Sequence, residues 1–303
     1  MFYVALIILK LFAFTLSLLP RRVFLAFGRG LGWLLRVTGF RARIARANME
    51  LAFPEWSAER REQLFRDHYR ELGVLFLELL RMFYRFDRFF ERYADVEGRE
   101  NMKAVLDKGK GAFAVTAHLG NWELLTLTAR YTFGVEATMV TKQLKPAWLH
   151  RCVEVTRALL GVKMACEPRT MQGILRGLKK NDIIGWVMDQ YAGAPVGVRV
   201  PFFGKPVGSH TALAALAART GTPVIPAIAV RKPDGRYLVR FEPELKIPPR
   251  STPEESLIAH TAVFVRHTES WVREFPAQWL WIHRRWKGDL SPLPPQVEGE
   301  MLK

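Results

Sequence analysis

The stretch from Ala112 to Leu125 constrains the fold more than any other part of this sequence. Its first part, residues 112–117, is a continuous apolar run that favours a strand and ends at His118. A Gly-Asn pair follows, and Glu123 then opens an apolar segment with helical character. This order predicts a buried strand, a tight turn and a helix, with the histidine at the carboxyl end of the strand.

The same stretch predicts a chemical site. The first turn of the helix would bring Glu123 back against the His118 ring, where a carboxylate fixes the tautomer and leaves the other ring nitrogen free as a base. A base of this kind deprotonates a hydroxyl that attacks an acyl group. His118 is the one histidine of seven with an acid five residues on, although about 0.7 such matches arise by chance. The alternative is a histidine that simply ends a strand, with Glu123 an ordinary first-turn acid.

A second apolar run, Ile183 to Met188, is typical of a strand buried on both faces, and it ends in the polar pair Asp189-Gln190. Other predicted strands cover residues 136–141, 224–230 and 237–242. Predicted helices cover residues 101–107, 121–132, 147–160, 170–179, 210–220 and 253–274, and residues 193–207 are predicted to be loop-rich. This alternation predicts an α/β fold with a central mixed, mostly parallel sheet flanked by helices.

The amino terminus suggests attachment to a membrane. Residues 1–20 are almost wholly apolar and long enough to cross a bilayer, although Lys10 near the centre would cost about 2.5–3.5 kcal/mol. Basic residues follow this segment, unlike in a signal peptide. The region Arg21 to Arg46 holds seven arginines and no acid, which places the rest of the chain on the cytoplasmic side. Trp33 and apolar neighbours suit interfacial helices, the alternative being a soluble amphipathic helix over the core.

Four regions follow from these patterns. We expect a transmembrane or membrane-anchoring helix over residues 1–20, a basic interfacial and aromatic helical region over 21–95, an α/β domain over 96–290 and a flexible tail over 291–303. The aromatic residues of the second region suit either an acyl groove or a core.

The charge balance predicts an anionic partner. Lysine and arginine exceed the acids by 45 − 29 = 16, which favours binding to anionic lipid or an acidic protein. Nucleic acid is disfavoured, because the arginines crowd the segment near the membrane and no nucleic-acid motif is present. Cys152 and Cys166 show no metal spacing and no disulfide framework. The sequence contains no P-loop or zinc motif, so we expect neither a metal nor a cofactor.

Six segments in a fixed order resemble the lipid A biosynthesis acyltransferases, bacterial inner-membrane enzymes of the wider glycerolipid and lysophospholipid acyltransferase fold. The resemblance runs from about Arg41 to Lys287, most of the chain, together with the apolar amino-terminal segment. The segments are residues 48–55, 118–123 (HLGNWE), 189–190 (DQ), 201–204 (PFFG), 221–226 (GTPVIP) and 278–286 (QWLWIHRRW).

The resemblance implies a role for each site residue. His118 would be the general base and Glu123 its partner, with the acceptor hydroxyl attacking an acyl thioester on acyl carrier protein. Arg157 is the best match for a supporting positive charge, and Lys142 is the other candidate. A positive group there would stabilise the thioester oxyanion or grip an acceptor phosphate. Substrate contacts are expected from Asn121, Asp189, Gln190, Phe203 and Gly204. Asp189 would orient the site through Gln190 or simply cap the next turn.

The resemblance therefore implies a membrane-bound O-acyltransferase at the bacterial inner membrane, with its catalytic domain on the cytoplasmic side. The expected acceptor is a lipid A precursor or related glycolipid. A lysophospholipid or ornithine lipid acceptor, and acyl coenzyme A as donor, are the alternatives within the same chemistry. A non-catalytic protein that binds anionic membranes is the alternative of another class, and it predicts that His118→Ala affects stability alone.

Overall fold

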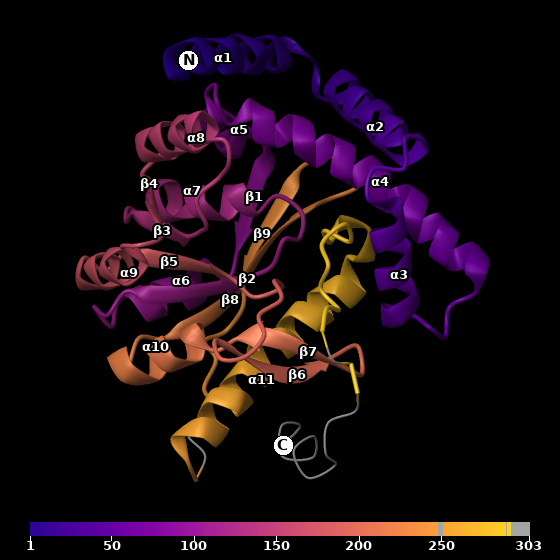
Figure 1. Cartoon of the computed structure of the whole chain (residues 1–303). Helices are drawn as coiled ribbons and strands as arrows, with labels where there is room; N and C mark the ends of the chain where they lie inside the picture. The colour runs from indigo at the N-terminus through magenta and orange to yellow at the C-terminus, as the bar shows by residue number, and fades with distance from the viewer. Residues whose placement is uncertain (248–250, 289, 292–303) are drawn as a thin grey trace.

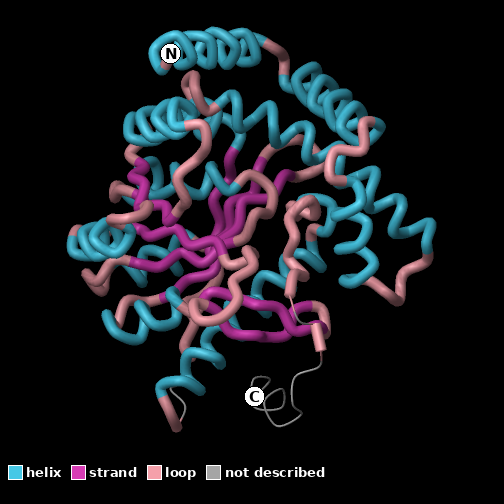
Figure 2. The backbone as a smooth tube through the Cα atoms, in the orientation of Figure 1, coloured by secondary structure: helices cyan, strands magenta, loops and turns pink. Residues whose placement is uncertain are grey.

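A seven-stranded sheet forms the centre of the molecule in the computed structural model, which describes residues 1–247, 251–288, 290 and 291. Its strand order is β1-β9-β8-β2-β5-β3-β4, and helices cover both faces (Figures 1 and 2). The strands are β1 (Ala94–Glu97), β2 (Ala112–Thr116), β3 (Ala137–Val140), β4 (Val162–Ala165), β5 (Ile183–Val187), β8 (Val224–Arg231) and β9 (Tyr237–Phe241). All neighbours in the sheet are parallel except the β8–β9 hairpin. The prediction of a mixed, mostly parallel sheet is confirmed.

The central strand β2 is buried on both faces because its side chains alternate between two cores. Phe113 and Val115 belong to a cluster that includes residues of α9, α10 and α11. Ala112 and Ala114 face a second cluster with residues of α5, α6, α7 and α8. This packing explains why the strand reads as a continuous apolar run.

The helices alternate with the strands as expected. They are α3 (Ala42–Ala52), α4 (Ala58–Arg81), α5 (Phe86–Tyr93), α6 (Arg99–Leu106), α7 (Trp122–Phe133), α8 (Ala147–Leu159), α9 (Thr170–Lys179), α10 (Ala212–Thr220) and α11 (Pro253–Glu274), followed by the 3₁₀ turn Pro276–Gln278. Ser57 caps the amino terminus of α4, since its side chain accepts a hydrogen bond from the amide of Arg60.

Three sequence-based predictions of secondary structure were incomplete. Residues 193–207 are not simply a loop, because β6 (Gly197–Phe202) and β7 (Lys205–His210) form an antiparallel hairpin there. The short strands β1 and β4 carried too few residues to give a periodic signal. The aromatic region after Ser57 forms α4 and α5, which are separated by a residue in left-handed conformation, Arg85 (φ 45°).

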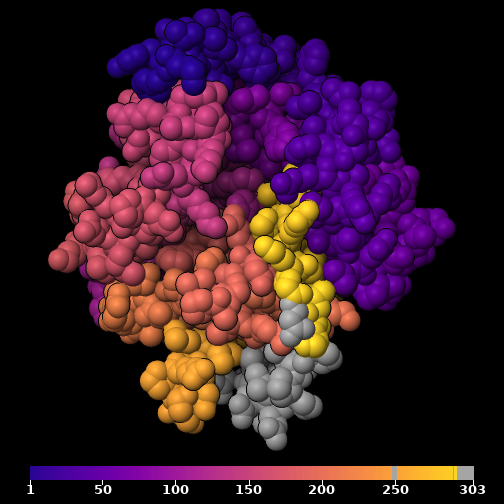
Figure 3. Space-filling model, in the orientation of Figure 1, coloured from indigo at the N-terminus to yellow at the C-terminus, as the bar shows by residue number. Residues whose placement is uncertain are grey.

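Helices α1 (Phe2–Leu18) and α2 (Arg21–Val37) cap one end of the molecule, where they are drawn in indigo and violet (Figures 1 and 3). Among the described residues, no single helix combines the length and apolar character needed to cross a bilayer, whereas α2 and α3, bent by 94°, meet both criteria together. The predicted membrane-spanning helix over residues 1–20 is therefore not supported. Most of the tail predicted over 291–303 lies outside the described residues.

Candidate active site

The loop between β2 and α7 carries His118 and is held rigidly by its neighbours. The amide of Gly120 donates to the carbonyl of Gln278 (3.0 Å), and that of Asn121 donates to the carbonyl of Ala229 in β8 (2.9 Å). Gly120 has φ +57°, and a Cβ atom there would lie 2.1 Å from the Ala229 carbonyl oxygen. The Gly-Asn pair thus allows a close approach that no other residue type permits.

The carboxylate that holds the His118 ring belongs to Asp189, not to Glu123. His118 Nδ1 lies 2.8 Å from Asp189 Oδ1, and Asp189 Oδ2 accepts hydrogen bonds from the His118 amide and from Trp279 Nε1, both at 2.8 Å. The prediction that Glu123 contacts this ring is wrong. The prediction that Asp189 acts through Gln190 or caps the next turn missed its direct contact with His118.

The register of two neighbouring parallel strands explains this pairing. Strand β2 pairs with β5 so that Thr116 lies opposite Val187, and two residues further along each chain stand His118 and Asp189. A clue was present in the sequence, since both residues follow continuous apolar runs and therefore lie at the carboxyl ends of buried strands. The adjacency of those two strands was not visible in the sequence.

The pair also sets the electrostatics of the site. Burial disfavours the imidazolium, but the carboxylate of Asp189 outweighs this and raises the pKa of His118 above its usual value. Burial likewise acts against the Asp189 carboxylate, but the neighbouring His118 ring and hydrogen bonds lower the pKa of Asp189 to about 2. Asp189 is therefore ionised at neutral pH and stabilises a proton on the His118 ring.

Glu123 forms a buried ion pair with Arg157 instead. Arg157 Nε lies 3.1 Å from Glu123 Oε2, and a second, shorter contact joins its terminal nitrogen to Oε1. The side chains are 5% and 11% exposed. This two-point pair links the first turn of α7 to α8 and satisfies both charges. Glu123 still influences His118 at longer range, as a further negative charge that raises its pKa.

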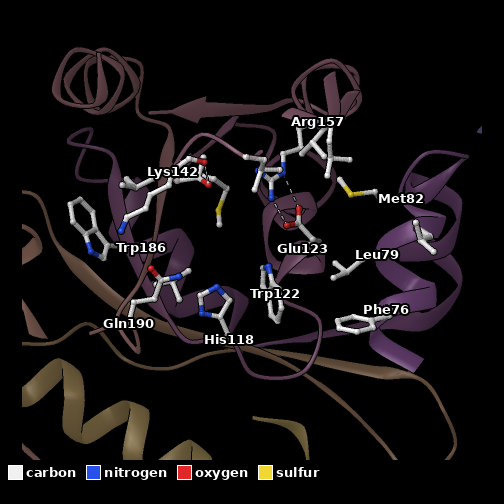
Figure 4. A pocket seen from close by; sticks show the side chains of 18 of the residues that line it. Phe76, Leu79, Met82, His118, Trp122, Glu123, Lys142, Arg157, Trp186 and Gln190 are labelled. Atoms are coloured by element: carbon white, nitrogen blue, oxygen red, sulfur yellow. Dashed lines mark hydrogen bonds and ion pairs between the residues drawn. The ribbon is translucent and has the colours of Figure 1, made fainter. Parts of the chain in front are cut away.

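A cavity of about 800 Å³ opens beside His118. In Figure 4, Phe76 and Leu79 of α4 and Met82 just after it lie on one side of the histidine, and Lys142, Trp186 and Gln190 lie on the other. Trp122 packs edge-on against the His118 ring, with the ring centroids 4.8 Å apart. The cavity thus joins an apolar end to a polar end, with the histidine between them.

The structure places only some of the predicted substrate contacts at this cavity. Arg157, Gln190 and Lys142 line it. Asn121 does not, since its side chain is fully buried and its amide donates to Glu78 Oε2 at 3.2 Å. Asn121 therefore holds the loop in place.

Phe203 and Gly204 lie at the turn of the β6–β7 hairpin, away from the cavity. Both have positive φ (52° and 66°), as a tight turn requires. The Phe203 ring packs edge-on against Phe53, and its amide donates to Glu269. Their sequence pattern therefore reflects a turn and not a substrate contact.

The carboxyl-terminal aromatic segment supports the site from behind. Trp279 and Trp281 are buried, and Trp279 binds Asp189. Arg285, in the same segment, is also fully buried. It donates to the carbonyls of Gln190 (3.1 Å) and Gly208 (2.7 Å) and to Ser209 Oγ (2.6 Å). Within the described part of the chain, no group of three metal-binding side chains lies close enough to hold an ion.

Comparison with known proteins identifies the family of this chain. The family model described as "Bacterial lipid A biosynthesis acyltransferase" matches residues 2–288. The chain is 28% identical over 273 residues to the lipid A biosynthesis lauroyltransferase of Escherichia coli, covering 89% of this chain and 87% of that protein. It is also 28% identical over 249 residues to the palmitoleoyltransferase of the same organism, covering 82% and 79%.

A more distant relative shares the chemistry but has another acceptor in its name. The chain is 27% identical over 201 residues to the phosphatidylinositol mannoside acyltransferase of Mycolicibacterium smegmatis, covering 65% of this chain and 64% of that protein. Because the family model spans nearly the whole chain, this protein is an acyltransferase that belongs to the bacterial lipid A biosynthesis acyltransferase family.

Proposed function

We propose that this protein transfers a fatty acyl chain from a carrier thioester to a hydroxyl of a lipid A precursor, with His118 as the general base and Asp189 as its partner. The observation that carries this proposal is the contact between His118 and Asp189 at the wall of a partly apolar cavity, in a chain of this family. With Nδ1 engaged by Asp189, Nε2 is the ring nitrogen that meets the substrate.

In the proposed reaction, Nε2 of His118 first accepts a proton and then returns it to the leaving group. Nε2 of His118 accepts the proton of the acceptor hydroxyl as its oxygen attacks the thioester carbonyl carbon. The carbon–sulfur bond then breaks, and the leaving thiolate takes the proton from the imidazolium. Asp189 stabilises the charged ring throughout. The Glu123–Arg157 pair holds α7 against α8 beside the reacting groups.

The apolar end of the cavity is the proposed site for the acyl chain. Side chains from α4, the turn after it, β3 and α8 line it, among them Leu79, Phe83, Met139 and Val153. Burying a chain there gains about 0.8 kcal/mol per methylene group. Some aromatic side chains of α4 therefore fill the core, whereas others line the proposed acyl groove.

We also propose that α1 and α2 attach the protein to the cytoplasmic face of the bacterial inner membrane. Both helices expose large apolar side chains, among them Ile7, Leu11, Phe27 and Trp33. Exposed apolar patches of this kind mark surfaces that contact a membrane or a partner protein. Attachment at the interface keeps the cavity near an acceptor that resides in the bilayer. Trp33→Glu combined with Phe27→Glu is expected to reduce co-sedimentation with anionic vesicles.

The donor is proposed to be acyl carrier protein, since an acidic carrier suits a chain with a net charge of +16. Acyl coenzyme A is the alternative donor. Another glycolipid is the alternative acceptor, supported by the relative that acylates a phosphatidylinositol mannoside by name.

The decisive experiment is transfer of a radiolabelled acyl chain in detergent micelles. Both donors are tested against a lipid A precursor, a phosphatidylinositol mannoside and a lysophospholipid, with wild type beside His118→Ala. Transfer to the lipid A precursor that is lost in the folded variant supports the proposal. Transfer only to one of the other two acceptors would keep the proposed chemistry but show that the acceptor is not a lipid A precursor. If no combination of donor and acceptor gives transfer, the proposal fails, and the alternative of a non-catalytic protein that binds anionic membranes replaces it.

A further inference from the structure

The polar end of the cavity contains a positive charge with no acidic partner. Among the described residues, one arginine and one lysine line the cavity, Arg157 and Lys142. Arg157 is neutralised by Glu123, whereas no carboxylate of the described residues lies within 4 Å of the Lys142 ammonium group. Glu167 also lines the cavity, but it makes no ion pair with Lys142. Lys142 is therefore the cation available to a ligand.

A histidine and a buried arginine also lie at or behind this end. Burial and then the charges of Lys142 and Arg285 lower the pKa of His210 below its usual value, which favours the neutral ring. Arg285 is fully buried and donates to neutral oxygen atoms of Gln190, Gly208 and Ser209. Among the residues that the structure describes, no carboxylate forms an ion pair with this positive charge behind the cavity wall.

Three of the side chains that line this end can bind an anion. Lys142 presents an ammonium group, and Gln190 presents an amide that has no hydrogen-bond partner among the residues the structure describes. Figure 4 shows the Lys142 and Gln190 side chains on the same side of His118. The His210 ring lines the same cavity and supplies an N–H donor when neutral. An anionic oxygen group between them would gain charge-assisted hydrogen bonds.

We propose that Lys142, Gln190 and His210 form a phosphate subsite that orients a substrate across His118. This inference rests on the proposed function, which it deepens by assigning the two ends of the cavity to different parts of the substrates. The phosphate has two possible sources in that reaction. One is a phosphate group on the glycolipid acceptor, and the other is the phosphodiester of the carrier arm that bears the thioester.

Steady-state kinetics with matched substrates separates the two sources. Lys142→Met is compared with wild type and with Lys145→Met, a matched control at an exposed lysine outside the cavity. The acceptor is used with and without its phosphate groups, and the donor is used as an acyl phosphopantetheine or an acyl pantetheine. Loss of a charged hydrogen-bond donor is expected to raise KM about 10- to 100-fold for the phosphorylated member of one pair. The member without phosphate should be unaffected.

If KM rises only for the phosphorylated acceptor, the subsite binds the acceptor phosphate. If KM rises only for the acyl phosphopantetheine, the subsite binds the phosphate of the donor. Either result supports the subsite. Lys142→Arg should restore most of the loss, because it retains the charge. An equal change for all substrates, or no change for any of them, would overturn the proposal.

A binding measurement keeps this inference separate from the proposed reaction. The His210 ring is followed by NMR while wild-type protein is titrated with inorganic phosphate, with His210→Gln used to assign the signal. A bound anion should raise the pKa of His210, and this response should disappear in Lys142→Met but persist in Lys145→Met. If wild type transfers no acyl chain, the proposed function fails and this titration still decides the subsite. If the His210 signal of wild type does not change when phosphate is added, the proposed subsite is wrong.

Discussion

Nδ1 of His118 lies 2.8 Å from Oδ1 of Asp189, although 71 positions separate the two residues in the chain. The contact joins the carboxyl ends of two neighbouring parallel strands, which are among the most rigid places in an α/β fold. Trp279 and the His118 amide hold the second carboxylate oxygen. A base whose orientation is fixed in this way needs little reorganisation when it accepts a proton.

Asp189→Asn tests this contact. The amide keeps the shape but removes the negative charge and favours the wrong tautomer, so kcat should fall about 10³- to 10⁴-fold. The pH profile should also move. His118 must be unprotonated to act as a base, and Asp189 raises its pKa, so the acidic limb of kcat/KM should shift to lower pH in the variant. An acidic limb that stays where it is in wild type would show that Asp189 does not set the pKa of the base.

The Glu123–Arg157 pair predicts a strong coupling in stability. Arg157→Met leaves a buried carboxylate without its partner and should cost about 3–5 kcal/mol of unfolding free energy. Glu123→Gln in the same background should recover much of that loss, because the uncompensated charge is gone. Urea unfolding of the two single variants and the double variant measures the coupling. Losses that simply add in the double variant would mean that the pair contributes nothing beyond its separate residues.

A second buried ionic cluster lies under the amino-terminal helices. Glu78 is fully buried and contacts Arg21 (2.8 Å), Arg231 (3.3 Å), Tyr237 and Asn121. Glu78→Gln should therefore destabilise the fold by about 3–5 kcal/mol, since it leaves buried arginine charge uncompensated. The control is Glu154→Gln, which removes an exposed ion pair with Arg151 and should cost about 0–1 kcal/mol. Chemical denaturation measures the free energy of unfolding of both variants. Equal losses in the two variants would mean that the buried cluster contributes no more to stability than an exposed ion pair.

His68 predicts a loss of stability in mild acid. Its ring is buried, and burial lowers the pKa of His68 to about 4, whereas the unfolded chain has a value near 6.5. Below pH 6.5 the unfolded state therefore binds the proton first, and stability falls as the pH falls toward 4. The contribution is about 2 kcal/mol between pH 7 and pH 5. Unfolding free energies of wild type and His68→Gln at several pH values test this, and an unchanged slope in the variant would contradict it.

The acyl groove predicts a change in chain-length preference. Val153 of α8 is buried at the cavity wall, so Val153→Phe should exclude part of a long chain. Each methylene group that no longer fits loses about 0.8 kcal/mol, a roughly fourfold discrimination. Mass spectrometry of the products formed from mixed acyl donors should show shorter chains. Leu159→Phe is the control, because Leu159 lies on the same helix but is 68% exposed; an equal shift in both variants would place the chain elsewhere.

The sequence by itself determined most of the elements and the position of His118 at the end of a buried strand. The apolar run before His118 and the Gly-Asn turn are local signals, and each predicted the structure that is present. The helix Pro253–Glu274 has the predicted bounds, because the proline at its start and its capping box are also local. Short-range backbone preferences and hydrophobic periodicity are enough for features of this kind.

Only the tertiary structure decided which carboxylate contacts His118. Glu123 is five residues from His118 and is the partner that the sequence predicts, yet α7 turns its side chain toward Arg157 on α8. Asp189 reaches the ring because β5 is the neighbour of β2 in a register that places the two strand ends opposite each other. Strand order and register follow from the packing of the whole sheet, so a contact that depends on them leaves no signal at any one place in the chain.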